Sequence, residues 1–568
     1  MRVAVALVLV LVASSATARR PARVSTAVSS NPQAFGAFSY QFSQTERIEV
    51  ASGRTLVSAI GRGHTPWMGW FPLRVSIDNS GGPTQTVKLV FRSNNGSGST
   101  EVTRSVEVDS GTRVTVSMPI PAEARYGSLE ASSPVIGRQT GQVGFTSVYD
   151  RNRLVLSLGT SDEFEAFLRQ KPDNATGEDQ VLPMPLDEAP TELTAYLGFH
   201  AVFITDERGF EGLNEAQRRA LEAWVSSGGT LVLKGPPRTK GVLPLLSTDE
   251  RIQPYGLGNV AFLGDDVSLS TVPQAKLQVA PLGQQESRRY ASSGTASYTA
   301  LLPQALVPVG RFLLIITLFT LLIGPGSVWV ARKRGPAVLL ATIPATAFVT
   351  CVVILGSSLL LDGFTVHGSS YGYTLLDRDR HRAISVGLTA WYANLAPRSA
   401  SYDATTGLIA PQRGGEPTAI DVDWSDGARF RSGFIPSRTY REWGVVSVEP
   451  SRARLVVKQK GEGFVLQNAL GMKVKAVWVR VGDDLFVARD VRDGAEVSLK
   501  PDDMVDETAL ELPARQRFVE SQWRPLVMAP LSDGQFLASV EGAGFVPTGG
   551  VAMNLHEGKH VVRGEVER

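Results

Sequence analysis

Hydrophobic and polar residues alternate in short runs near both ends of the chain. Leu73–Ile77, Thr100–Val108 and, much later, the short run Glu496–Leu499 carry this period-two pattern. Such a pattern predicts β-strands with one buried face, and several short strands separated by turns predict a sandwich. We therefore expect a β-sandwich over residues 36–148 and a second, sandwich-like β domain over residues 364–568.

The pattern changes between these two regions to fully apolar runs that alternate with amphipathic segments. Three apolar runs predict buried strands: Leu154–Leu158, Ala201–Ile204 and Thr230–Leu233. Residues 161–170 predict a capped helix, and a second helix begins at Asn214, where Gln217 completes a capping box. Strand–helix alternation of this kind predicts a small parallel α/β domain over residues 150–282.

Two long uncharged segments follow a linker at 283–310. Residues 312–331 and 336–361 are each long enough to cross a bilayer, which needs roughly 20 apolar residues. The alternative is a buried helix pair of a soluble protein, but such helices seldom lack charge on every face. Gly324-Pro325-Gly326 and Pro344 are expected to kink the two helices.

The charges around these segments predict their orientation. Arg332, Lys333 and Arg334 lie in the short loop 332–335, and cytoplasmic loops are enriched in Lys and Arg. The loop is therefore expected inside the cell, with the regions before and after the helices outside.

The first 18 residues resemble a secretory signal peptide. Arg2 precedes the apolar run Val3–Ala13, and Ala16-Thr17-Ala18 offers a cleavage site after residue 18. An uncleaved anchor is the alternative, but the apolar run is too short to span a bilayer. The N-terminal segment and the two apolar segments thus predict a protein of the cytoplasmic membrane whose large regions are extracytoplasmic.

Composition excludes several classes of function. The chain has 57 Lys+Arg and 55 Asp+Glu, a formal charge of +2, so no overall field would draw it to nucleic acid. Its single cysteine, Cys351, can form neither an internal disulfide nor a cysteine-rich zinc site.

The predicted membrane helices and signal peptide indicate the partners. The expected partners are the lipid bilayer and another protein of the cell envelope.

One stretch carries a family resemblance. Residues 200–235 (HAVFITDERGFEGLNEAQRRALEAWVSSGGTLVLKG), 255–266 (YGLGNVAFLGDD) and the LLIGPG motif at 321–326 resemble uncharacterised bacterial envelope membrane proteins with a class I glutamine amidotransferase-like domain. The resemblance implies the same plan: signal peptide, β-sandwich, amidotransferase-like domain, paired membrane helices and a C-terminal β region.

The residues needed for amidotransferase chemistry are not in place. That reaction uses a cysteine nucleophile on a strand-to-helix turn and a histidine to take its proton. Cys351 lies in a predicted membrane helix, and His200 is the only histidine between 150 and 282. What remains is a candidate ligand crevice at the carboxyl ends of the strands, where Ser161 and Asp206 could line it. Their structural interpretation is a helix cap for Ser161 and a turn for Asp206.

Two further motifs match poorly with the chemistry that they suggest. Gly368-Ser369-Ser370-Tyr371-Gly372 fits the pattern of a hydrolase nucleophile, but strand residues, not a helix, follow Ser370. The segment 421–427 resembles a calcium loop with a misplaced glycine, so a hairpin turn is the favoured interpretation.

The sequence therefore predicts a multidomain α+β membrane protein with no catalytic residue, metal site or cofactor. Its expected function is non-enzymatic: extracytoplasmic domains anchored in the membrane bind another envelope component. The alternative is a ligand sensor or enzyme that uses the crevice of the α/β domain.

Overall fold

The structure is a computed structural model. It describes residues 38–42, 44–66, 69–95, 98–147, 154–159, 177–206, 208–234, 243, 252–262, 301–302, 309–361, 365–409, 419–512 and 527–568. The expected signal peptide, the expected helix at 161–170 with Ser161, and most of the expected linker at 283–310 lie outside these residues.

Two sheets share a hydrophobic core in the first part of the chain. The smaller sheet has the order β2 (Glu46–Ala51), β3 (Leu56–Arg62), β5 (Trp70–Asp78) and β8 (Arg113–Pro121). The larger sheet contains β10 (Gly137–Gly144), β9 (Tyr126–Ser133), β6 (Gln85–Asn95) and β7 (Gly98–Val108), and a short pair joins β4 (His64–Thr65) to β11 (Thr146–Ser147). Val75 and Leu89, one from each sheet, are fully buried in the same core, as the alternating pattern predicts.

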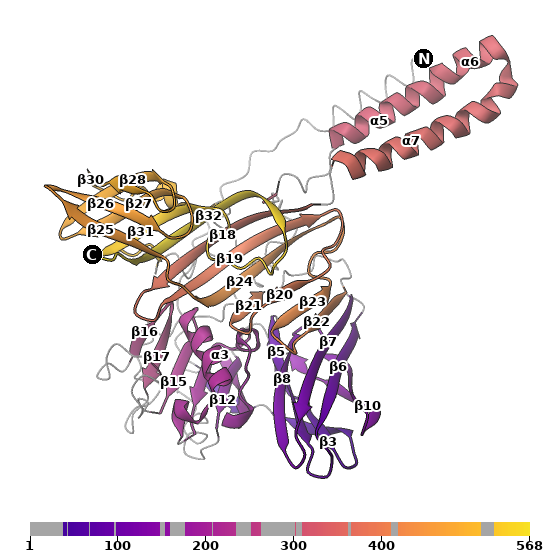
Figure 1. Ribbon diagram of the computed structural model, residues 1–568. Coiled ribbons are helices and arrows are strands. Elements are labelled where there is room, and N and C mark those ends of the chain that lie inside the picture. The colour runs from indigo at the N-terminus through magenta and orange to yellow at the C-terminus, as the bar shows by residue number, and fades with distance from the viewer. Residues whose placement is uncertain are drawn as a thin grey trace. The chain divides into compact units, whose positions relative to one another are not determined.

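Three more strands of the larger sheet come from the far side of the apolar helices. They are β22 (Ile420–Asp423), β23 (Ala428–Ser432) and β20 (Ala400–Tyr402), and they extend the sheet beyond β7 (Figure 1). Strands β7 and β22 are parallel, with Ile420 opposite Thr100. The sheet therefore crosses the boundary that the sequence predicts between two separate β domains.

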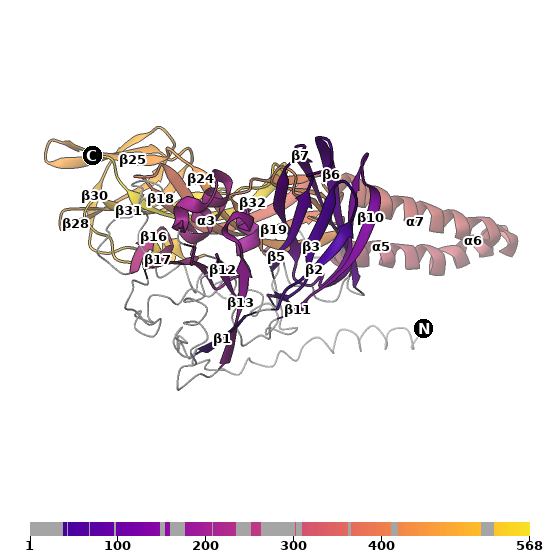
Figure 2. The same ribbon diagram turned by 90° about the horizontal axis from the view of Figure 1, so that it is seen from below.

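The central region contains a mostly parallel sheet. Its order is β1 (Phe38–Phe42), β13 (Gly177–Met184), β12 (Leu154–Leu158), β14 (Ala201–Ile204), β15 (Thr230–Leu233), β17 (Gly258–Phe262) and β16 (Ile252–Tyr255). Only β16 is antiparallel to its neighbour. The edge strand β1 precedes the first sandwich in sequence and lies beside β13 (Figure 2).

Helix α3 (Glu215–Ser226) packs into the core of this region. The predicted capping box is present, because Asn214 accepts from the Gln217 backbone N–H and the Gln217 side chain accepts from the Asn214 backbone N–H. Trp224 is 1% exposed and faces Tyr196, which lies in the short helix η3 (Leu193–Tyr196). Two other short helices are η2 (Leu186–Glu188) and η4 (Gly209–Gly212).

The C-terminal region is built on a nine-stranded sheet. Its order is β21 (Thr406–Ile409), β24 (Thr439–Pro450), β19 (Arg382–Ala393), β18 (Val366–Asp377), β32 (Met553–Glu565), β31 (Gln535–Glu541), β27 (Val474–Val481), β28 (Asp484–Val491) and β30 (Lys500–Asp502). A three-stranded sheet contributes to a core with it: β25 (Arg454–Lys460), β26 (Gly463–Ala469) and β29 (Glu496–Ser498). Helix α8 (Glu507–Leu510) is short.

Specific contacts join the C-terminal region to the α/β region. Arg382 donates to Glu222 of α3 at 2.8 Å, and the Thr194 hydroxyl donates to the Thr406 carbonyl oxygen at 3.1 Å. One hydrophobic core also contains residues of both regions, such as Trp224 and Ile384. The chain before the apolar helices is thus packed against the chain after them.

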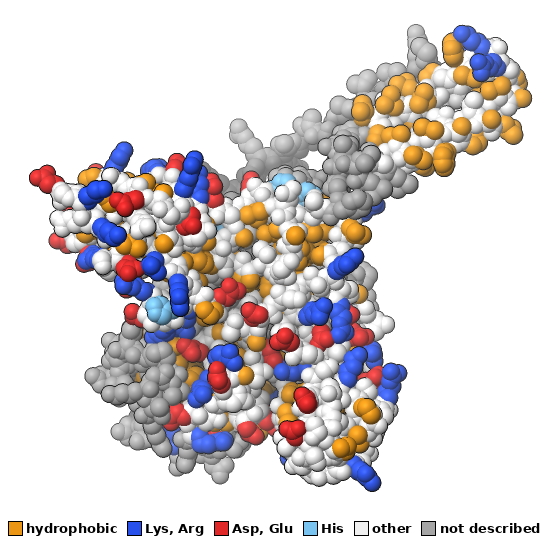
Figure 3. Space-filling view, in the orientation of Figure 1, with side chains coloured by type: hydrophobic (Ala, Val, Ile, Leu, Met, Phe, Trp, Pro, Cys, Tyr) orange, Lys and Arg blue, Asp and Glu red, His pale blue; other side chains and the backbone are white. Residues whose placement is uncertain are grey.

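Two helices are long and apolar enough to cross a membrane. The first consists of α5 (Val309–Leu321), a π-helical turn at Leu322–Gly326 and α6 (Ser327–Arg334); the second is α7 (Leu339–Leu361), after a 3-10 turn at Pro336–Val338. The π turn contains Pro325, whereas α7 continues through Pro344 without interruption. None of the most apolar stretch of either helix is buried, and Lys and Arg side chains gather at the turn between them (Figure 3).

Candidate functional site

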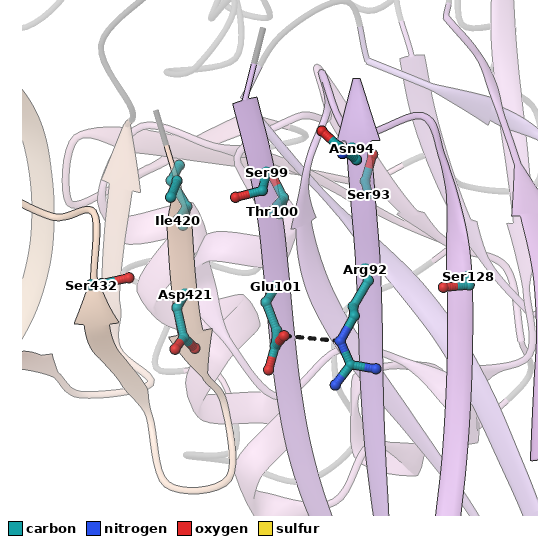
Figure 4. A pocket seen from close by; sticks show the side chains of 11 residues that line it. Arg92, Ser93, Asn94, Ser99, Thr100, Glu101, Ser128, Ile420, Asp421 and Ser432 are labelled. Carbon is teal, nitrogen blue, oxygen red and sulfur yellow. Dashed lines mark hydrogen bonds and ion pairs between the residues drawn. The ribbon is translucent and has the colours of Figure 1, made fainter. Parts of the chain in front are cut away.

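A polar hollow lies on the larger sheet of the first sandwich. It is found where β7 meets β22 and β23, which follow the apolar helices in the chain. Its volume is about 470 Å³. The lining residues come from β6, β7, β9, β22 and β23, together with Ala419 beside β22 (Figure 4). The hollow therefore exists only when β22 and β23 have paired with β7.

Strand register places five lining residues in one row across the sheet. Ser128 lies opposite Arg92, Arg92 opposite Glu101, Glu101 opposite Asp421 and Asp421 opposite Ser432. Directly opposed residues of neighbouring strands place their side chains on the same face. Alternation along each strand puts the buried residues Phe91 and Val102 on the other face, toward the core.

The centre of the row is a network of ion pairs. Arg92 donates to Glu101 at 2.9 Å and to Glu130 at 2.8 Å, and Arg138 reaches Glu130 at 3.0 Å. The hydrogen bond to Glu101 is the main cause that raises the pKa of the Arg92 guanidinium above its ordinary value. Because the Arg92 and Glu101 side chains stay 46% and 38% exposed, both keep polar atoms accessible from the hollow.

Asp421 lacks a hydrogen-bond partner at one of its two carboxylate oxygens. Its Oδ1 atom is buried without a hydrogen-bond partner, and Nη1 of Arg431 lies 3.9 Å from it. Burial raises the pKa of the Asp421 carboxyl; Arg431 opposes this, and the neighbouring carboxylates of Glu101 and Asp423 add to it.

The lining chemistry suits a polar, uncharged or weakly cationic ligand. Carboxylates accept hydrogen bonds, the Arg92 guanidinium donates them, and the surrounding Ser, Thr and Asn side chains do either. None of the lining residues is aromatic, so stacking does not contribute. The hollow can orient a hydrogen-bonding chain, such as a peptide or a polyol.

The structure describes only one of the two predicted crevice residues. Asp206 follows β14 and binds Arg208 through both carboxylate oxygens, which lowers the pKa of the Asp206 carboxyl. Gly159, after the neighbouring strand β12, has φ +94°, and a Cβ there would lie 2.6 Å from the Asp206 side chain. Asp206 therefore closes a turn against Gly159, while Ser161 lies outside the described residues.

The hydrolase-like motif lies inside a strand. Ser370 is fully buried in β18, and its hydroxyl lies 3.3 Å from Nε2 of His560 and 3.3 Å from the Thr389 hydroxyl. His560 is also fully buried, and burial lowers the pKa of its imidazole to about 3. The pair has a nucleophile and a base within reach, but the strand-turn-helix setting and access for a substrate are missing.

The other two sequence candidates are structural. Segment 421–427 forms the end of β22 and the turn into β23, with Asp423 bound to Arg431, so the hairpin interpretation is confirmed. Cys351 lies within α7. Among the described residues, no group of three or more His, Cys, Asp or Glu side chains could hold a metal ion.

Comparison with known proteins gives little functional information. A family model described as a domain of unknown function (DUF8726) matches residues 57–134, which run from β3 through β9. No curated protein sequence matches the chain.

Two solved structures show weak likeness. One is a Paenibacillus sp. cycloisomaltooligosaccharide glucanotransferase complexed with cycloisomaltoheptaose, at 12% identity and a TM-score of 0.13, covering 34% of this chain and 28% of that one. The other is a glycosyl hydrolase family 2 member from Bacteroides cellulosilyticus DSM 14838, at 10% identity and a TM-score of 0.13, covering 88% of this chain and 77% of that one. At these TM-scores neither carries an inference about fold or activity.

Proposed function

We propose that the protein is a non-enzymatic, membrane-anchored receptor of the cell envelope, whose extracytoplasmic body binds another envelope component through the polar hollow. The anchor is the apolar hairpin, and Arg332–Arg334 face the cytoplasm. In this proposal residues 1–18 are a cleaved signal peptide, and the α/β region is the amidotransferase-like domain that its sequence resembles.

The pairing of β7 with β22 is the observation that carries the proposal. Thr100 and Ile420 lie on opposite sides of the apolar hairpin in sequence, yet they are neighbours in one sheet. Two segments can pair in this way only on the same side of a membrane. This supports a hairpin that enters and leaves the bilayer from one side, as the basic loop also indicates.

The apolar surface of the hairpin supports the anchor. Side chains such as Leu314, Leu340 and Phe348 are 63%, 87% and 71% exposed. Contiguous apolar surface of this kind is costly in water and favourable in lipid. A body fixed at the membrane by two helices presents its hollow to the space outside the cytoplasm.

The hollow is the best candidate for the binding surface because polar groups converge there. Asp421 has an unsatisfied buried oxygen, and Arg92 and Glu101 remain partly exposed. Binding sites typically place a few polar groups in a concave surface.

Photo-crosslinking in intact cells tests the proposal. A photoreactive amino acid is placed at Ser99, which lines the hollow, and in a matched variant at Glu107, which is exposed on the same face of the same strand. We expect a discrete adduct at higher mass from position 99 and none from position 107. Equal labelling at both positions, or at neither, would contradict binding through the hollow.

A further inference from the structure

Two histidines face each other on neighbouring strands of the nine-stranded sheet. Nδ1 of His367 in β18 and Nε2 of His556 in β32 are 2.7 Å apart. The ring centroids are 4.9 Å apart with an angle of 33° between the planes, and the contact is exposed. These residues take no part in the polar hollow.

A β-bulge lies at this contact. His367 pairs with Asn554 and Gly368 with Leu555, but Ser369 pairs with Glu557, so His556 is an extra residue in β32. Bulges commonly re-aim a side chain next to a functional site. Here the bulged residue is the one whose imidazole meets His367.

A neighbouring hydroxyl orients one of the two rings. Thr365 Oγ1 lies 3.4 Å from Nε2 of His367, which leaves Nδ1 of that ring directed to His556. Metal-binding histidines generally have their second ring nitrogen held by such a hydrogen-bonding partner. Thr365 therefore supplies for His367 the kind of support that ligating histidines have.

We propose that His367 and His556 form a two-histidine site for a divalent transition-metal ion such as Cu²⁺ or Zn²⁺. Imidazole nitrogens suit these ions, whereas Mg²⁺ and Ca²⁺ prefer oxygen ligands. Two nitrogens bound at about 2.0–2.1 Å in tetrahedral geometry are about 3.3 Å apart, so the present separation widens by roughly 0.6 Å. Small rotations of two exposed rings provide that change.

The site would hold its ion with moderate affinity. The described residues place no third His, Cys or carboxylate in a metal-binding group with this pair, so water completes the coordination. An ion bound by both rings would link β18 to β32, which are parallel neighbours. Because β18 directly follows the second apolar helix in the chain, the link would brace the base of the hairpin.

Metal titration of the full-length protein tests the proposal. The protein is purified in detergent without a histidine tag, stripped with a chelator and titrated with Cu²⁺ or Zn²⁺ by calorimetry, and Cu²⁺ is examined by electron paramagnetic resonance. We expect one ion per chain, nitrogen hyperfine structure from two imidazoles, and no comparable binding of Mg²⁺. Absence of binding to the folded protein would overturn the proposal.

Variants separate this site from adventitious binding to histidine. His367→Gln and His556→Gln should each lower the affinity at least tenfold, and Thr365→Val should lower it about tenfold through the lost hydrogen bond. His381→Asn is the matched control, because His381 is exposed and has φ +48°, a conformation that asparagine tolerates. Unchanged affinity in the two glutamine variants would show that the ion binds elsewhere and would also overturn the proposal.

Discussion

Trp70 and Trp424 meet edge to face, with ring centroids 5.7 Å apart and an angle of 85° between the planes. Trp70 belongs to β5 and Trp424 to the turn between β22 and β23, so the two rings come from opposite sides of the apolar hairpin in sequence. Both are almost completely buried in the same core. The first sandwich is therefore completed by residues that follow the hairpin.

Replacing Trp424 by alanine should destabilise the first sandwich although the residue lies far outside it in sequence. The lost burial and the cavity left behind cost about 3–5 kcal/mol. Limited proteolysis should then cut within residues 44–147 at lower denaturant concentration. Leu395→Ala, at a residue that is 59% exposed, is the control. Cleavage confined to the C-terminal region would contradict a shared core.

A disulfide between β7 and β22 should form in an oxidising envelope. Glu101 and Asp421 are opposed, and neighbouring strands place their Cα atoms at a separation that a disulfide spans. In a Cys351→Ser background, Glu101→Cys with Asp421→Cys should resist thiol labelling in cells until reductant is added. Ser128→Cys with Asp421→Cys is the control, because two strands, β6 and β7, separate those residues. Free thiols in the test pair would argue against the proposed topology.

The contributions of Arg74 and Glu188 to the free energy of unfolding should be strongly coupled, because the two side chains form a buried ion pair. Arg74 of β5 donates to Glu188 at 3.1 Å, and both side chains are less than 10% exposed. Arg74→Met leaves a buried carboxylate whose other partner, Arg47, is 3.5 Å away, so we expect a loss of about 3–5 kcal/mol. Adding Glu188→Gln should recover part of that loss. Additive effects in urea unfolding of the double-mutant cycle would refute the coupling.

Burial of His560 should make the protein less stable in acid. The folded-state pKa of about 3 lies below the ordinary value of 6.5, so the neutral ring is the form that folding favours. This contribution is complete above pH 6.5 and falls by about 1.4 kcal/mol per pH unit as the pH drops toward 3. Replacing His560 by methionine should flatten the curve of unfolding free energy against pH.

Two variants complete that measurement. Leu395→Ala, at an exposed residue that does not titrate, should keep the wild-type slope. Ser370→Ala should also keep it and leave the cellular role intact, since the Ser370 hydroxyl contacts only the buried His560 ring and the Thr389 hydroxyl among the hydrogen bonds found for it. An identical slope in His560→Met and the wild type would show that His560 does not dominate acid sensitivity.

Local patterns predict the elements of this fold well. The capping box of Asn214 and Gln217 and the apolar runs at β12, β14 and β15 depend on neighbours in sequence, and each is found where the pattern places it. The same holds for the apolar helices, whose composition alone indicates their length.

Long-range pairing was not predictable in the same way. Nothing in the residues around Ile420 indicates that β22 pairs with β7 rather than with a strand of its own region, since an alternating pattern specifies a face and not a partner. The row from Ser128 to Ser432 follows only from that pairing, so the hollow could not be derived from the sequence. The contacts of His367 with His556 and of Ser370 with His560 depend on the register of β18 with β32 for the same reason.

The pairing of β7 with β22 also means that the first sandwich cannot be completed until β22 has been synthesised. Ser105 donates its backbone N–H to Ser425, a residue 320 positions later in the chain. At about 5–20 residues per second, the ribosome needs roughly 15–65 s to supply that partner. During this interval the first sandwich has the edge of β7 open and the place of Trp424 unfilled, a state prone to aggregation. The first sandwich is thus expected to depend on chaperones until β22 and β23 have been synthesised.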